Sequence, residues 1–103
     1  MKLKCICDNE TLLENGFSNH VKDVFYLCKR VDNSTFKGMD MGMTLNITIQ
    51  DVTRKVKLQL IDEADLSGVD LNDLRMDFKI KIEKRINEVL NHLKNKGVLK
   101  EYK

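Results

Sequence analysis

The hydrophobic pattern is most regular in the C-terminal third of the chain. Between Asp70 and Gly97, apolar residues recur at helical spacing on one side, at Leu71, Leu74, Phe78, Ile82, Ile86, Val89, Leu90 and Leu93. Asp70 is a typical N-cap residue, and Gly97 suits the left-handed position that follows a helix. We therefore predict one long amphipathic helix over 70–97.

Two apolar residues in this segment do not fit the stripe. Met76 and Ile80 fall on the opposite side of the helix, and residues 74, 76, 78, 80 and 82 also alternate with the period of two that is typical of a strand. Either the helix has a second apolar site, or a strand over 74–82 precedes a shorter helix. The residues at both ends favour the single helix, so Met76 and Ile80 become a candidate binding surface.

Strict alternation marks the middle of the chain. In Met43 to Gln50 every second residue is apolar, beginning with Met43, and the residues between them are polar. Arg54 to Ile61 repeats the pattern, with Val56, Leu58 and Leu60 on one side. The two segments predict a hairpin with one face on the core and one face in water.

Shorter elements are expected before this hairpin. Lys2 to Cys7 predicts a strand, and Thr11 to Asn15 predicts a short helix capped by Asn9 and ended by Gly16. Val21 to Val31 is rich in β-branched and aromatic residues and predicts another strand, with a helix as the alternative. The expected fold is α+β in a single domain, 1–103: an antiparallel sheet of three to four strands with one long C-terminal helix packed on one face. The end of the chain, with Val98, Leu99 and Tyr102, is expected as a short tail lying back on the core.

Two segments are expected to be irregular. Asp32 to Gly42 contains polar turn residues and two glycines, and Asp62 to Val69 is an acidic loop. Met39 and Met41 lie in the first segment. Either they lie against the edge of the core, or they form an adaptable apolar contact surface, because the unbranched thioether side chain repacks easily.

Composition narrows the function. Eighteen basic and sixteen acidic residues leave a net charge of +2, which is too low to predict a strongly basic nucleic-acid-binding domain. No apolar run is long enough to cross a membrane, and no apolar segment of a secretory signal follows the first residues. Three cysteines argue against a disulfide framework and suit the cytoplasm. The absence of proline and tryptophan, with abundant lysine and asparagine, is typical of an AT-rich genome such as that of a low-GC bacterium or its phages.

Few residues suggest chemistry. Cys5 and Cys7, with Cys28 and His20, form the one candidate set of metal ligands, but in a strand the two sulfurs of Cys5 and Cys7 would lie about 7 Å apart. We therefore expect buried cysteines and no metal. No phosphate-binding loop, dinucleotide fingerprint or nucleophile motif is present, so neither a cofactor nor an enzymatic activity is predicted.

The favoured function is a small non-enzymatic protein-protein interaction module, such as an adaptor, inhibitor or regulatory subunit, phage-encoded or carried by a mobile element. Its predicted contact residues are Met76, Ile80, Met39 and Met41, and a homodimer is one form it could take. The alternative is an RNA- or ribosome-binding module that uses Lys55 and Lys57 on the polar sheet face. The order strand, helix, strands, long helix is similar in topology to ribosome-associated hibernation factors, which implies the same alternative.

Overall fold

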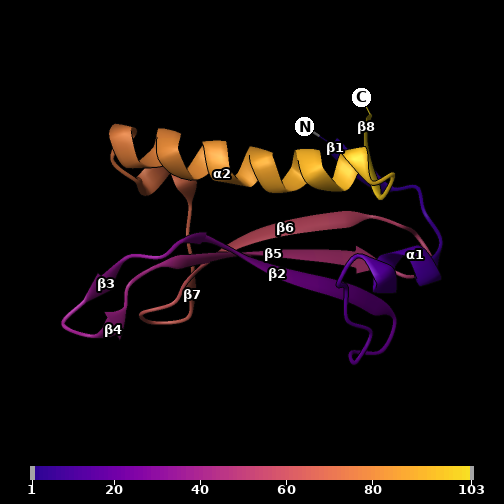
Figure 1. Cartoon of the computed structure of the whole chain (residues 1–103), viewed down its shortest axis with the longest axis horizontal. Coiled ribbons are helices and arrows are strands. Elements are labelled where there is room, and N and C mark those ends of the chain that lie inside the picture. The colour runs from indigo at the N-terminus through magenta and orange to yellow at the C-terminus, as the bar shows by residue number, and fades with distance from the viewer. Residues whose placement is uncertain (1, 103) are drawn as a thin grey trace.

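The computed structural model describes residues 2–102 as a sheet covered on one face by a long helix (Figure 1). In chain order its elements are β1 (Lys2–Cys5), α1 (Asn9–Glu14), β2 (Val24–Asp32), β3 (Thr35–Phe36), β4 (Met39–Asp40), β5 (Met43–Gln50), β6 (Val56–Asp62), β7 (Ser67–Gly68), a 3-10 helix (Leu71–Asp73), α2 (Met76–Asn95) and β8 (Leu99–Tyr102). The main sheet is antiparallel in the order β2-β5-β6-β7. The predicted α+β class, with its small antiparallel sheet and long C-terminal helix, is confirmed.

The central strand β5 follows the predicted alternation except at Thr44, which was expected to face water and is 7% exposed. Leu45, Ile47 and Ile49 are at most 2% exposed and form the middle of the core, whereas Asn46 and Thr48 are only half-buried on the other face. β6 runs back beside β5 in antiparallel pairing, as expected from the hairpin pattern. From α2, the side chains of Ile82, Leu90 and Leu93 complete the core against these strands.

The helix begins later than predicted. Asp70 does accept a hydrogen bond from a backbone N–H, that of Asn72, but this caps the 3-10 helix and not α2. Leu74 and Arg75 then adopt extended backbone angles, and α2 starts at Met76 without a side-chain cap. No strand forms over 74–82, so the single helix was the better interpretation and its first six residues were wrongly assigned. An aspartate closes a short turn as readily as it caps a long helix, so the sequence did not distinguish the two.

The end of α2 agrees with the prediction. Gly97 has φ +75°, and the N–H of Val98 reaches back to the carbonyl of Leu93 over 2.9 Å. This is the bond that satisfies the last carbonyls of a helix when a left-handed residue follows it. The chain then reverses, and what was expected as a short tail is the strand β8, which pairs with β1 from Cys5↔Leu99 to Lys2↔Tyr102.

The N-terminal elements are shifted slightly from their predicted bounds. Asp8, not Asn9, caps α1, and Gly16 with φ +91° ends the turn that follows it. β2 is a strand as favoured, but it starts at Val24, and Val21 remains 54% exposed.

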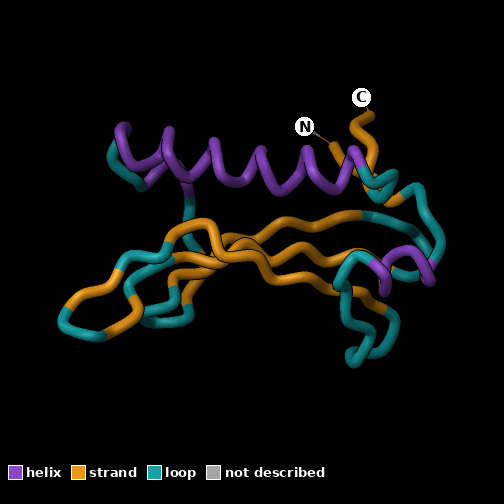
Figure 2. The backbone as a smooth tube through the Cα atoms, viewed as in Figure 1, coloured by secondary structure: helices purple, strands orange, loops and turns teal. Residues whose placement is uncertain are grey.

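Both segments expected to be irregular contain short strands (Figure 2). β3 and β4 form a hairpin between β2 and β5, hereafter the β3–β4 hairpin, and β7 adds a fourth strand to the sheet within the acidic loop. The hairpin turn consists of Lys37 and Gly38, both with positive φ, which is the conformation that two-residue hairpin turns require. A lysine in this conformation is uncommon, so the turn was not predicted.

Candidate functional site

Met76 and Ile80 lie on the side of α2 that faces away from the sheet. Their side chains are 69% and 59% exposed, although the helix buries other apolar residues against the core. Because they are four residues apart, they are neighbours on the helix surface. The orientation predicted for this pair, away from the core, is confirmed.

The β3–β4 hairpin carries the other predicted contact residues. Met39 is 61% exposed and Met41 is 42% exposed, and Phe36 opposite Met39 is exposed as well. The two methionines therefore do not lie buried at the edge of the core. The ammonium group of Lys37 sits 5.4 Å from the centre of the Phe36 ring, within the range of a cation–π contact.

An ion pair fixes the hairpin to β2. Arg30 donates from both terminal nitrogens to the carboxylate of Asp40, over 2.6 and 2.7 Å, and the N–H of Gly42 donates to the same carboxylate over 3.0 Å. The hydrogen bonds from Arg30, followed by that from Gly42, lower the pKa of Asp40 to about 2. These hydrogen bonds join the base of the hairpin to β2.

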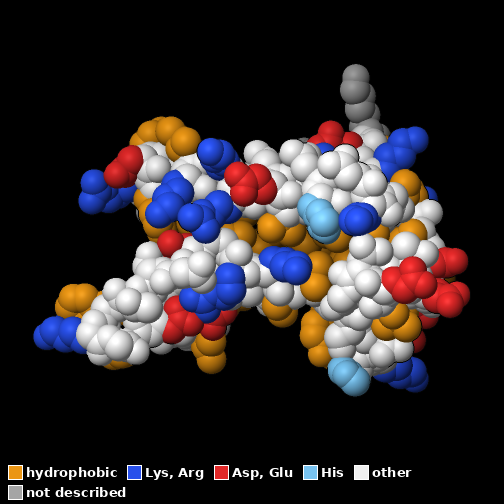
Figure 3. Space-filling model, viewed as in Figure 1, with side chains coloured by type: hydrophobic (Ala, Val, Ile, Leu, Met, Phe, Trp, Pro, Cys, Tyr) orange, Lys and Arg blue, Asp and Glu red, His pale blue; other side chains and the backbone are white. Residues whose placement is uncertain are grey.

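The two groups of exposed apolar residues occur at the same end of the molecule. Figure 1 shows the β3–β4 hairpin and the first turns of α2 at one end of the long axis, with β1, β8 and α1 at the other. In Figure 3, hydrophobic side chains appear over the start of the helix and again at the hairpin. We call Met39, Met41, Met76 and Ile80 the apolar end.

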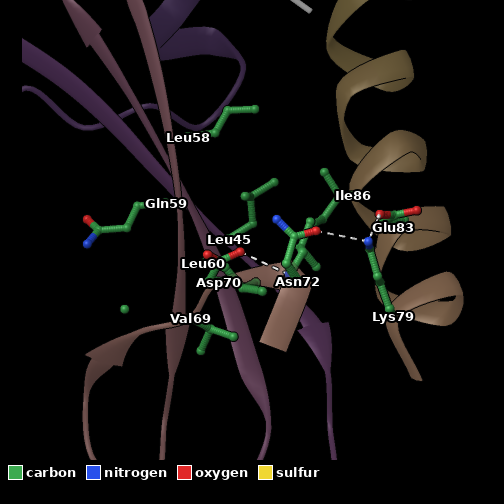
Figure 4. A pocket seen from close by; sticks show the side chains of 12 residues that line it. Leu45, Leu58, Gln59, Leu60, Val69, Asp70, Asn72, Lys79, Glu83 and Ile86 are labelled. Carbon is green, nitrogen blue, oxygen red and sulfur yellow. Dashed lines mark hydrogen bonds and ion pairs between the residues drawn. The ribbon is translucent and has the colours of Figure 1, made fainter. Parts of the chain in front are cut away.

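A cleft opens between the sheet and the first half of α2 (Figure 4). Its volume is about 620 Å³, and its walls are mainly apolar, with Leu58, Leu60 and Val69 on the sheet side and Ile86 on the helix side. At the rim, the ammonium of Lys79 donates to the side chain of Asn72 over 3.1 Å and lies 4.0 Å from Glu83. These residues can hold an apolar group, but they do not place a nucleophile beside a base.

A second, smaller groove separates the other half of α2 from β2. It has a volume of about 360 Å³, with Leu27, Val89 and Leu93 among its apolar lining residues. Basic residues from both elements surround it, and Glu88 is the acidic residue among them. Figure 3 shows this boundary between helix and sheet, where hydrophobic side chains are recessed between basic ones.

The cysteine geometry differs from the prediction. The Sγ atoms of Cys5 and Cys7 are 3.7 Å apart, about half the separation expected for a straight strand, because β1 ends at Cys5 and the chain turns there. Burial, and then the hydrogen bond with Cys5, raise the pKa of Cys7 to about 11. Cys28 is exposed on β2, so the expectation of buried cysteines is wrong for this residue. Within residues 2–102, no three His, Cys, Asp or Glu side chains converge as metal ligands.

The predicted nucleic-acid contacts are both exposed: Lys57 lies on β6, and Lys55 directly precedes that strand. Lys55 forms a bridge with Lys4 of β1, and Lys4 is in turn opposite Lys100 of β8. Sequence reasoning missed these neighbours because they depend on pairing between the two ends of the chain. The sequence contained two signals. Lysines alternate at positions 2 and 4, and the residues of β8, which were expected to be a tail, include Lys100.

No helix within residues 2–102 combines the length and apolar character that crossing a membrane requires. No protein-family model matches the chain, and no curated protein is significantly similar in sequence. The fold is similar to the crystal structure of a DUF1831 family protein from Lactobacillus plantarum, with a TM-score of 0.71. The match covers 95% of this chain and 82% of the other at 13% sequence identity, so it shows a shared fold alone.

Proposed function

We propose that this chain is a small non-enzymatic module that binds another protein through its apolar end, with a second copy of the chain as the simplest partner. The single observation that carries the proposal is the exposure of Met39, Met41, Met76 and Ile80, between 42% and 69%, at one end of a molecule whose core does not include them. Patches of exposed apolar side chains are typical of contact surfaces, and this end carries two of them, one over the start of α2 and one at the hairpin (Figure 3).

The chemistry of these residues suits a protein partner. Three of the four are methionines, whose flexible side chains adapt to surfaces of different shape. The arm that presents Met39 is held by Arg30 and Asp40, so little ordering is required of the backbone when a partner binds. The odd number of cysteines supports a cytoplasmic location for this module, and we propose the same bacterial or phage setting as the composition suggests.

Met76 and Ile80 are expected to contribute enough binding free energy to be measured. Complete burial of a methionine or isoleucine stabilises a complex by about 1.5–3 kcal/mol, and these two side chains are already partly covered. Burying the remainder is then worth about 1–2 kcal/mol for each residue. Together Met76 and Ile80 would change the dissociation constant by about 30-fold to about 1000-fold.

The test is the double variant Met76→Lys/Ile80→Lys, with Val52→Lys as its matched control. Val52 is 89% exposed in the turn between β5 and β6, away from the apolar end, and also exchanges an apolar side chain for a lysine. Sedimentation velocity over a range of concentrations should show dimers for the unaltered chain and for the Val52 variant, and monomers for the double variant. Thermal unfolding should give all three proteins similar melting temperatures.

Two results would contradict the proposal. Loss of the folded state in the double variant would mean that both residues belong to the core. A monomeric unaltered chain would exclude the homodimer. Affinity capture would then use the Val52 variant and the double variant as baits. A partner that both baits retain does not bind through the apolar end, which would contradict the proposal.

A further inference from the structure

The two terminal strands form a separate two-stranded sheet, and an isolated bridge to the residue before β6 brings lysines from three segments together. Lys4 in β1 lies opposite Lys100 in β8 and, on its other side, forms a bridge with Lys55 at the start of β6. The N–H of Cys5 donates to the carbonyl of Arg54 over 3.0 Å, which fixes β1 against the start of β6. Residues directly opposite each other in antiparallel strands point to the same face, so Lys100, Lys4 and Lys55 form one row.

Two more lysines share this face. Lys2 and Lys57 are each two residues from a member of the row, and side chains two apart on a strand point the same way. On β1 the alternate residues confirm the direction of Lys2 and Lys4, because Leu3 and Cys5 are buried at 7% and 3% exposure. We call Lys2, Lys4, Lys55, Lys57 and Lys100 the lysine face; all five are exposed.

No Asp or Glu among residues 2–102 forms an ion pair with these lysines. Throughout residues 2–102, none of the five ammonium groups lies within 4.0 Å of an Asp or Glu oxygen, since the ion pairs of this part of the chain involve other residues. Like charges directly opposite each other destabilise a strand pair, and here three stand in one row. The repulsion between these lysines lowers the stability of the free protein, and an anion with several charges that binds across the row would reduce it.

Aromatic side chains border the lysines. Tyr102 is the partner of Lys2 in the β1–β8 register and is 47% exposed. On the other side, Lys57 lies opposite Thr48, which lies opposite the half-buried Tyr26. Proteins bind single-stranded nucleic acid with cations that contact the phosphates and with aromatic rings on which the bases stack.

We propose that the lysine face, together with Tyr102, binds single-stranded nucleic acid. The occupant follows from the row of lysines beside an exposed ring, because in a single strand the phosphates contact cations and the bases stack on rings. This surface lies beside the C-terminal end of α2, at the end of the molecule opposite the apolar end (Figure 1), so the inference goes beyond the proposed protein-binding function and does not depend on it.

Binding of this kind has a characteristic salt dependence. Each phosphate contact to a single strand contributes about −0.7 to the slope of log affinity against log salt. Five lysines give a slope of about −3.5, so affinity should fall about a hundredfold between about 50 mM and about 200 mM salt.

The experiment uses the full chain and fluorescently labelled mixed-sequence oligonucleotides of about twelve nucleotides, within the range of known single-strand sites. RNA and DNA versions are titrated in parallel by fluorescence anisotropy, because the phosphates and bases are common to both. Lys4→Glu/Lys55→Glu should weaken binding at least about a hundredfold. Lys81→Glu/Lys84→Glu, which changes two exposed lysines of α2 and alters the net charge equally, should weaken it less than about threefold.

Tyr102→Ala separates stacking from charge. It should lower affinity about tenfold and leave the salt slope unchanged, because a stacked base contributes independently of the phosphate contacts. If a charge-reversed protein melts at a lower temperature than the unaltered chain, Lys4→Gln/Lys55→Gln takes its place and should still lower affinity about tenfold.

Three outcomes would overturn the inference. One is the absence of binding to either oligonucleotide at about 50 mM salt. Another is an equal loss of binding in the variants of the lysine face and of α2, which would show a response to net charge alone. The third is binding to vesicles containing anionic phosphatidylglycerol without binding to oligonucleotides, which would assign the face to a membrane surface.

Discussion

Gly42 joins the β3–β4 hairpin to the main sheet, and its replacement by alanine is the sharpest test of how the hairpin is held. A Cβ atom at this position would meet the carbonyl oxygen of Asp32 at 2.1 Å and Nη2 of Arg30 at 2.5 Å. The backbone of Gly42 is also engaged on both sides, because its N–H donates to Asp40 and its carbonyl accepts from the N–H of Glu63 over 3.0 Å. The residue therefore cannot simply move aside.

The magnitude follows from the closeness of the backbone contact. Carbon and oxygen atoms that are not bonded approach to about 3.2 Å at the closest, so strand β2 or β5 would have to shift by about 1 Å, and forced shifts of this kind cost about 1–3 kcal/mol. Alanine also restricts the unfolded chain, which offsets about 0.4–1 kcal/mol. We expect a net loss of about 1–2 kcal/mol in the free energy of unfolding. In a domain of this size the melting temperature then falls by about 5–15 °C.

Gly38→Ala is the matched control within the same hairpin. Gly38 has φ +79°, but no atom lies within 4 Å of the position of its Cβ, so alanine meets backbone strain without a clash. Calorimetry should show a larger loss for Gly42→Ala, and amide hydrogen exchange should be faster in β4 and the start of β5. Equal melting temperatures for the unaltered chain and Gly42→Ala, or a larger loss for Gly38→Ala, would refute the steric argument.

Three further predictions concern titrating and buried side chains. The pKa of Cys7 is raised from 9.0 to about 11, so its contribution to stability is complete below about pH 9 and is lost as the pH rises toward 11. At neutral pH, iodoacetamide should therefore alkylate the exposed Cys28 before Cys7, and peptide mass mapping would show the order. The pKa of Asp40 is lowered from 3.8 to about 2, so the contribution of its pair with Arg30 to stability is present above about pH 4 and is lost as the pH falls to about 2. NMR titration of the carboxyl group should find this midpoint, and Arg30→Gln should raise it. Ile82→Ala should lower the free energy of unfolding in urea by about 2–5 kcal/mol, because Ile82 is 0% exposed, and a loss below about 1 kcal/mol would contradict its place in the core.

The parts of the fold that were predictable depend on local signals. The alternation from Met43 to Gln50 identifies β5 almost residue by residue, and Gly97 marks the end of α2 through its backbone conformation. The β3–β4 hairpin was missed because its turn uses Lys37 at φ +51°, where asparagine or glycine would have been the usual signal. The start of α2 was missed because Asp70 makes the expected bond in a different local structure.

The two candidate sites also differ in how far local sequence patterns predict them. The outward position of Met76 and Ile80 follows from helical spacing within one segment, and the sequence was sufficient to find it. The lysine face requires knowing that β1 pairs with β8 on one side and bridges to the start of β6 on the other. Contacts between chain ends are set by packing of the whole domain, which no local pattern encodes. Two of its five lysines, Lys55 and Lys57, were therefore predicted without the neighbours that make them a surface.

Helical spacing explains why Met76 and Ile80 face outward, but the inner side of the first turns is also poorly covered. The fully buried residues of α2 begin at Ile82, and the first turns lie over a cleft of about 620 Å³ whose wall includes Leu58, itself 37% exposed. The start of α2 is thus covered incompletely on its inner side and not at all on its outer side. A partner that covers the apolar end would therefore stabilise the part of the helix that the protein's own core holds least.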